Sequence, residues 1–185
     1  MAASDIPSGA PVAHHKALSP SAAAVRVALV TASDSRTPDT NEGGRLLRRL
    51  IEESGFSVTS DDLLAEDPAA LRDTVARLAG DADVVIVTGG TGIGPRDRTP
   101  DAVGALFDRR LPGFGELFRM LSFQEIGPAA MLSRADAGVV GAALVFLLPG
   151  SPAAVELAVR RLIAPELTHA VGQLRRASTH HHHER

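Results

Sequence analysis

Continuous apolar runs alternate with amphipathic segments along this chain. Residues 25–31 and 84–88 are apolar at almost every position, which is typical of strands buried on both faces of a parallel sheet. Residues 56–64 alternate only loosely and predict a strand nearer the edge of the sheet. Two more strands, joined by a tight turn, are predicted at residues 131–140 and 142–148.

Helices are predicted between these strands because apolar residues recur there three and four positions apart. Residues 41–54 carry leucines and Ile51 on one face and Arg or Glu on the other. Asp67 and Pro68 are suited to the N-cap and the first position of the next helix. Later helices are predicted at residues 100–107, within residues 111–123, and from Pro152 onwards, where Pro165 should kink or restart the last helix.

This alternation predicts a three-layer α/β fold with a doubly wound, mostly parallel sheet. We expect one folded domain over residues 25–173. Residues 1–24, rich in Ala, Ser, Pro and Gly, predict a disordered arm. Residues 174–185 predict a flexible tail that contains histidines.

The most informative stretch runs from Val84 to Asp101. The buried strand leads directly into four glycines at Gly89, Gly90, Gly92 and Gly94. Thr99 is expected to be an N-cap and Pro100 the first residue of the helix that follows. A strand, a glycine loop and a helix start together predict a site that accepts phosphate or another anion, because backbone N–H groups converge there. A tight structural turn is the alternative.

Two common glycine motifs do not fit this loop. A Walker A loop needs a lysine after the glycines, and the only lysine in the chain is Lys16. The dinucleotide fingerprint fits Gly90 and Gly92 but meets Pro95 where its third glycine belongs. A nicotinamide-dependent oxidoreductase is therefore the weakest of the functions considered.

Composition narrows the chemistry. The chain of 185 residues has no Cys, Trp or Tyr and a formal net charge of −3. The absence of a basic cluster argues against nucleic-acid binding, and no apolar run is long enough to span a membrane. The N-terminus lacks the pattern of a signal peptide, and a cysteine-free chain suits the cytoplasm. The groups that remain for chemistry are carboxylates, hydroxyls, arginines and backbone amides. Such groups suit metal-assisted phosphoryl or nucleotidyl transfer.

Two aspartates are candidates for a Mg²⁺ site. Asp97 lies between Arg96 and Arg98 and could form a surface ion pair. A carboxylate inside an anion pocket would repel phosphate unless it held a cation, so we favour Asp97 as a metal ligand. Asp67 already has a structural explanation as an N-cap, worth about 1 kcal/mol.

The stretch Thr88-Gly89-Gly90-Thr91-Gly92 followed by Pro95-Arg96-Asp97-Arg98-Thr99-Pro100-Asp101 resembles the signature of the MoaB/Mog family of molybdenum cofactor biosynthesis proteins. The resemblance extends over residues 25–170 and includes Ser33-Asp34-Ser35-Arg36, Pro112-Gly113-Phe114-Gly115-Glu116, Leu132-Ser133-Arg134 and Leu148-Pro149-Gly150-Ser151-Pro152. It implies an α/β fold of the molybdopterin-binding type, a homotrimer or hexamer, and molybdopterin and ATP as substrates.

The resemblance implies that Asp67 and Asp97 are the two functionally important aspartates and hold Mg²⁺. It also implies a binding pocket formed by Ser33, Asp34, Gly89, Gly90, Thr91, Gly92, Thr99, Glu116, Ser133, Pro149, Gly150 and Ser151. Active members adenylylate molybdopterin with Mg-ATP and release pyrophosphate before molybdate insertion, so a molybdenum-insertion protein is a possible partner. A non-catalytic molybdopterin-binding or scaffold protein is the main alternative, because residues 118–127 look more like MoaB, and some MoaB proteins lack clear activity.

Overall fold

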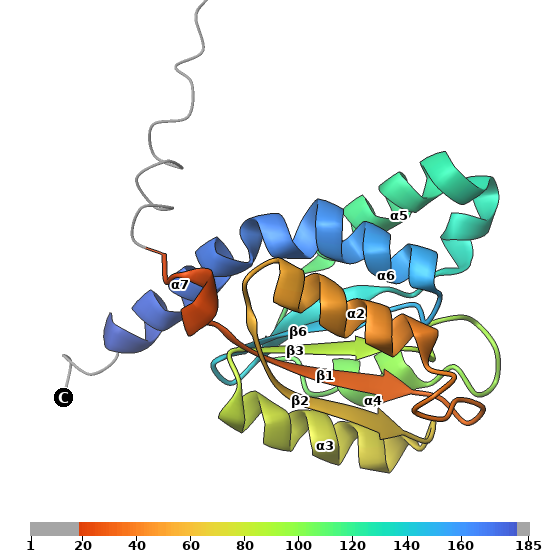
Figure 1. Ribbon diagram of the computed structural model, residues 1–185, viewed down its shortest axis with the longest axis horizontal. Coiled ribbons are helices and arrows are strands. Elements are labelled where there is room, and N and C mark those ends of the chain that lie inside the picture. The colour runs from red at the N-terminus through yellow and green to blue at the C-terminus, as the bar shows by residue number, and fades with distance from the viewer. Residues whose placement is uncertain (1–18, 181–185) are drawn as a thin grey trace, which may run out of the picture.

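One six-stranded sheet forms the centre of the computed structural model, which describes residues 19–180 (Figure 1). The strand order is β2-β1-β3-β6-β5-β4. β1, β2, β3 and β6 are parallel, whereas β5 is antiparallel to β6 and β4 is antiparallel to β5. The strands are β1 Arg26–Ala32, β2 Ser57–Leu64, β3 Val84–Thr88, β4 Arg109–Arg110, β5 Asp136–Val140 and β6 Ala143–Leu148.

Helices cover both faces of this sheet. α2, α6 and α7 lie over one face, and α3 and α4 lie over the other (Figure 1); α5 packs beside α6. The helices are α2 Glu42–Glu53, α3 Pro68–Asp81, α4 Thr99–Gly104, α5 Pro112–Ile126, α6 Pro152–Ala158 and α7 Ala164–His180. Short turns of other helix types are η1 Ala22–Ala24, η2 Gly127–Leu132 and η3 Val159–Ile163. The predicted doubly wound α/β fold is confirmed.

Strands that are apolar at most positions supply both cores. Val27 and Leu29 of β1 pack into the core under α2 and α6. Ala28 and Val30, the alternate positions of the same strand, pack into the second core under α3. Successive side chains of a strand point to opposite faces of the sheet, so both faces of β1 must be apolar. β2 lies at the edge of the sheet, as its looser alternation predicted.

Two predicted boundaries were wrong. Helix α4 begins at Thr99 and its N-cap is Arg98, because the Thr99 N–H donates to Gly90 O (3.1 Å) and draws its side chain inward. Residues 131–135 are not part of a strand. Gly127 has a positive φ of 63° and Pro128 follows it, and together they begin the η2 turn, so pairing with β6 starts only at Asp136.

The last helical segment continues through Pro165. The N–H of Ala164 donates to Val159 O, five residues earlier, and the resulting π turn lies directly before the proline. Proline removes a donor and its ring would collide with the preceding turn of a regular helix. The wider η3 turn therefore allows the helical path to continue without a break into α7, up to His180.

Within the described residues, the fold continues on both sides of the predicted domain, residues 25–173. Residues 1–18 of the expected arm lie outside the described residues, whereas Ala22 packs against the core. α7 also runs into residues assigned to the tail. Within residues 19–180, no helix is long and apolar enough to cross a membrane.

The strand order places a switch point between β1 and β3. From β1 the chain passes to β2 on one side, and later to β3 and β6 on the other. In open parallel sheets, ligands bind in the crevice beyond the carboxyl ends of the strands at such a switch point. The loops after β1 and β3 are those with Ser33, Asp34 and the glycines, so topology brings these candidate residues to one edge.

Candidate functional site

Four loops follow the parallel strands β1, β2, β3 and β6 at the carboxyl edge of the sheet, at residues 33–37, 65–68, 89–99 and 149–152, and hydrogen bonds join them in pairs. The Ser33 N–H donates to Leu64 O (2.8 Å), which joins the loops after β1 and β2. The Gly89 N–H donates to Leu148 O (2.9 Å), and the Thr88 hydroxyl donates to Pro149 O (3.0 Å). The glycine loop therefore lies beside the loop after β6, as the parallel pairing of β3 with β6 requires.

Gly89 and Gly90 are needed for the shape of the glycine loop. Their φ angles are 104° and 62°, in the region that L side chains rarely adopt. A Cβ on Gly89 would also lie 2.1 Å from Ala32 O. The backbone of this loop consequently lies directly against the end of β1, and only glycine permits this contact.

Thr91 and Thr99 are buried beneath the loop. They are 3 % and 1 % exposed, and a Cβ on Gly90 would lie 2.5 Å from the Thr99 hydroxyl oxygen. That hydroxyl has no hydrogen-bond partner within residues 19–180. A buried polar atom without a partner is costly, which suits a group that completes its bonding with a bound ligand.

Asp97 closes the glycine loop. Its carboxylate accepts from the Gly94 N–H (2.8 Å), and the Asp97 N–H donates to Gly94 O (3.0 Å). A Cβ on Gly92 would lie only 2.8 Å from the same carboxylate oxygen. The structure therefore places Asp97 inside the loop and against its glycines, instead of in a surface ion pair with a neighbouring arginine.

Asp67 and Asp34 each cap a backbone turn. Asp67 accepts from the Ala70 N–H (2.7 Å) and is the N-cap of α3, as the sequence predicted. Asp34 accepts from the Glu66 N–H (2.9 Å), which links the loop after β1 to the loop before α3. The serine beside it, Ser33, accepts from the Ser35 N–H (3.3 Å). These roles position the loops and leave other carboxylate lone pairs available.

Glu66 is a carboxylate that the sequence reasoning did not single out. Burial, and then the negative charges of Asp34 and Asp97, raise the pKa of Glu66 above its usual value, against a smaller opposing effect of Arg96. Carboxylates on two other loops, Asp34 and Asp97, therefore act on Glu66. An acid directly beyond the carboxyl end of β2 was the available signal in the sequence.

This group of acids fits a cation that arrives with its ligand. Within residues 19–180, no three acidic or histidine side chains lie close enough to hold a metal ion by themselves. Mg²⁺ commonly uses one or two carboxylates, water and substrate phosphates. The mutual repulsion that contributes to the raised pKa of Glu66 would be relieved by such a cation, with Asp97 as the ligand closest to the glycines.

The turn after β6 meets the glycine loop from the other side. A Cβ on Gly150 would be 3.4 Å from Gly89 Cα, and one on Gly43 of α2 would be 2.6 Å from Gly150 O. Ser151 is the N-cap of α6 and accepts from the Ala154 N–H (3.4 Å). Pro149, Gly150 and Ser151 thus lie at the same edge as the glycines, as predicted.

Glu116 lines a neighbouring cavity of about 400 Å³, and Ser133 directly precedes two other residues that line it, Arg134 and Ala135. Arg110 and Arg119 also line this cavity, which shares Asp101 and Arg134 with the cavity beside the glycine loop. The Ser133 hydroxyl accepts from the Ala135 N–H (3.3 Å). The structure therefore does not place these two residues among the four loops, but beside them.

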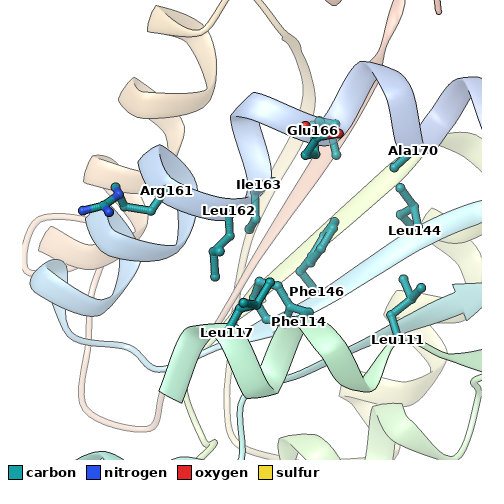
Figure 2. Close-up of a pocket in the computed structure, with 11 residues that line it drawn as sticks. Leu111, Phe114, Leu117, Leu144, Phe146, Arg161, Leu162, Ile163, Glu166 and Ala170 are labelled. Carbon is teal, nitrogen blue, oxygen red and sulfur yellow. The ribbon is translucent and has the colours of Figure 1, made fainter. Parts of the chain in front are cut away.

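A third cavity, of about 390 Å³, lies between α5 and α7 (Figure 2). Leu111, Phe114, Leu144 and Phe146 point into it, and the guanidinium of Arg161 extends away from these side chains. A lining of this kind offers few donors for phosphate. The cavity lies apart from the glycine loop and is not the candidate site for anions.

The fold and this site define an α/β protein with a glycine loop and a group of acids at the switch point of its sheet. The family described as "Probable molybdopterin binding domain" matches residues 28–169, and the chain belongs to this family of molybdenum cofactor biosynthesis proteins.

Known proteins match this chain along nearly their whole length. Molybdenum cofactor biosynthesis protein B of Bacillus cereus is 47 % identical over 170 residues, which cover 89 % of this chain and 98 % of the relative. A crystal structure of a molybdenum cofactor biosynthesis protein B is 49 % identical, with a TM-score of 0.78 over 82 % of this chain and 96 % of that one. The tungsten cofactor synthesizing protein MoaB from Pyrococcus furiosus is 31 % identical, with a TM-score of 0.74 over 82 % and 97 % of the two chains.

Proposed function

We propose that this protein adenylylates molybdopterin with Mg-ATP and releases pyrophosphate. One observation carries the proposal: the glycine loop lies against Asp97, and the charges of Asp97 and Asp34 help to raise the pKa of Glu66 on a neighbouring loop. A site that offers backbone donors beside carboxylates can bind phosphates and the cation that accompanies them.

The reaction needs no nucleophile from the protein. An oxygen of the terminal phosphate of molybdopterin attacks the α-phosphorus of ATP, a new P–O–P bond forms, and the bond from the α-phosphorus to the bridging oxygen breaks as pyrophosphate leaves. Nucleotidyl transfer of this kind depends on positioning and charge stabilisation. The chain has no Cys and no Tyr, and its only Lys, Lys16, lies outside the described residues.

Each group of the site then has a distinct task. Glycine-loop amides donate to a phosphate and hold it against the end of β1. The buried Thr99 hydroxyl is available to complete its hydrogen bonding with the ligand. Asp97, with Asp67 as the second aspartate that the resemblance implies, would hold Mg²⁺, which neutralises phosphate charge when it is bound.

Assembly and partners are part of the proposal. We expect a homotrimer or hexamer, and the exposed apolar side chains of one region support contacts between copies. Those side chains are Leu117, Met120, Phe123 and Ile126 of α5 and Met131 and Leu132 of η2. Such a concentration of exposed apolar residues is typical of an interface. A molybdenum-insertion protein that receives the adenylylated product is the expected downstream partner.

The test is pyrophosphate release from ATP in the presence of Mg²⁺ and freshly prepared molybdopterin, with native protein and an Asp97→Asn variant. We expect release that requires molybdopterin and that the variant loses. Tight molybdopterin binding by the native protein without any release would refute the catalytic proposal. It would favour the second candidate, a binding or scaffold protein. The structural hydrogen bonds that Asp67 and Asp97 accept are compatible with this alternative.

A further inference from the structure

Arg134 makes an unusual set of contacts with the glycine loop. Its backbone N–H donates to Thr91 O (2.9 Å), its Nε donates to Gly92 O (2.8 Å) and its Nη2 donates to Asp97 O. Its Nη1 donates to both carboxylate oxygens of Asp101 in α4 (3.1 Å each). One residue, located between η2 and β5, therefore holds the beginning and the end of the loop and the first turn of the helix after it.

These contacts fix which way the peptide groups of the loop point. In a trans peptide the C=O and the following N–H point in opposite directions. The carbonyls of Thr91, Gly92 and Asp97 face Arg134, so the N–H groups of Gly92, Ile93 and Arg98 face away from it. None of these three N–H groups donates a hydrogen bond to another group of residues 19–180. Successive N–H groups on one side of a loop form a concavity that binds anions.

We infer that Arg134 is a positioning residue that holds the glycine loop with these three amide groups turned towards the phosphate of the ligand. The inference rests on the proposed function and adds a role for a residue outside the predicted site. Arg134 acts through the loop, because its backbone nitrogen and each of its three guanidinium nitrogens already donate to a loop carbonyl or to Asp101.

The planar guanidinium is essential to this role. Arginine presents N–H donors in a rigid fork, whereas lysine offers a compact ammonium on a flexible chain. A lysine at position 134 would keep the positive charge but could not reach Gly92 O, Asp97 O and Asp101 in one fixed geometry. The charge and the positioning can therefore be separated by Arg134→Lys, with Arg134→Gln as the variant that loses both.

Arg175 provides a matched control at the opposite end of the sheet. Its Nη2 donates to Ala24 O (3.1 Å) and pairs with the Asp83 carboxylate (3.0 Å), so it too bridges a carbonyl and an acid. Arg175→Lys makes the same chemical change away from the glycine loop. Asp101→Asn removes the ion pair of Arg134 but leaves its bonds to the loop carbonyls.

The experiment has two readouts. Hydrogen exchange of the Gly94 and Asp97 amides, which are bonded within the loop, should in the protein without ligand be at least tenfold faster in Arg134→Lys and Arg134→Gln and unchanged in Arg175→Lys. Calorimetric titration with Mg-ATP should give a Kd at least tenfold higher for both Arg134 variants, equivalent to about 1.4 kcal/mol. Asp101→Asn should change the Kd by less than threefold.

The outcomes separate the inference from the proposed function. Native exchange rates in Arg134→Lys would overturn the inference whatever the activity. A native Kd for Mg-ATP in Arg134→Lys would show that only the positive charge at position 134 matters. Faster exchange with unchanged Kd would also overturn it. If the native protein bound no Mg-ATP while exchange still depended on Arg134, the proposed function would fail and the anion role with it, whereas the hold of Arg134 on the loop would be supported.

Discussion

Gly89→Ala tests the close approach of the glycine loop to the end of β1. The added Cβ would lie 2.1 Å from Ala32 O and 3.2 Å from its carbonyl carbon. Both are backbone atoms of a central strand that pairs with β2 on one side and β3 on the other. No side-chain rotation can remove this overlap, so the loop and the strand must separate.

The expected destabilisation has two parts. Holding alanine at the φ of 104° found here costs roughly 1–2 kcal/mol. Moving packed backbone to make room costs roughly another 1–3 kcal/mol. The free energy of unfolding should therefore fall by about 2–5 kcal/mol, which lowers Tm by about 4–20 °C for a domain of this size.

Urea denaturation and thermal unfolding of the native protein, Gly89→Ala and Gly80→Ala measure this effect. Gly80 lies near the end of α3 without a positive φ, and a Cβ there meets no atom within 4 Å. Gly80→Ala should therefore stabilise the protein by about 0.5–1 kcal/mol through helix propensity. A Gly89→Ala protein within 1 kcal/mol of native stability would refute the packing argument, because neither part of the estimate allows so small a change.

Further predictions concern the aspartates, the metal and one ion pair. Asp67→Asn should keep native stability, because Asn is an equally good N-cap, whereas Asp67→Ala should lose about 1 kcal/mol. If both variants lose pyrophosphate release while the Asp67→Asn protein unfolds like native protein, Asp67 acts in the reaction. EDTA should abolish pyrophosphate release and added Mg²⁺ should restore it, and activity that persists in EDTA would contradict the proposal. Burial alone would raise the pKa of Asp83, but hydrogen bonds from the Arg26 backbone and from the Arg175 and Arg26 side chains outweigh it and lower the pKa below 3.8. Because the folded-state pKa is depressed, this stabilisation is present above pH 3.8 and is lost as the pH falls through the folded-state pKa. The difference in the free energy of unfolding between native protein and Asp83→Asn should therefore shrink below about pH 4. A difference that grew there would refute the predicted direction of the pKa shift.

The sequence alone determined the layers of the fold. Strands such as residues 84–88 are apolar at almost every position, and only a sheet covered on both faces buries such a strand completely. The cap at Asp67 was also local, because a side chain that accepts from an N–H three residues later needs no distant partner. The four loops at one edge followed from the parallel order of the strands.

Tertiary contacts decided what local patterns could not. Thr99 has the sequence of an N-cap, yet its N–H bonds to Gly90 O and its hydroxyl is buried, so the helix begins one residue earlier than its cap pattern indicated. Residues 131–135 were predicted as the start of a strand, but the η2 turn ends at Leu132 and Arg134 bonds to the glycine loop, more than thirty residues before it.

The candidate site shows the same division. Glycines, hydroxyls and aspartates in the loops could be assigned from the sequence, because their chemistry and their place after buried strands are local properties. Glu66 and Arg134 could not, since the charge around Glu66 comes from Asp34 and Asp97 on other loops, and the contacts of Arg134 join segments that only folding brings together. Sequence patterns record which groups a segment offers, whereas the distances between segments, and hence pKa values and hydrogen-bond partners, exist only in the folded chain.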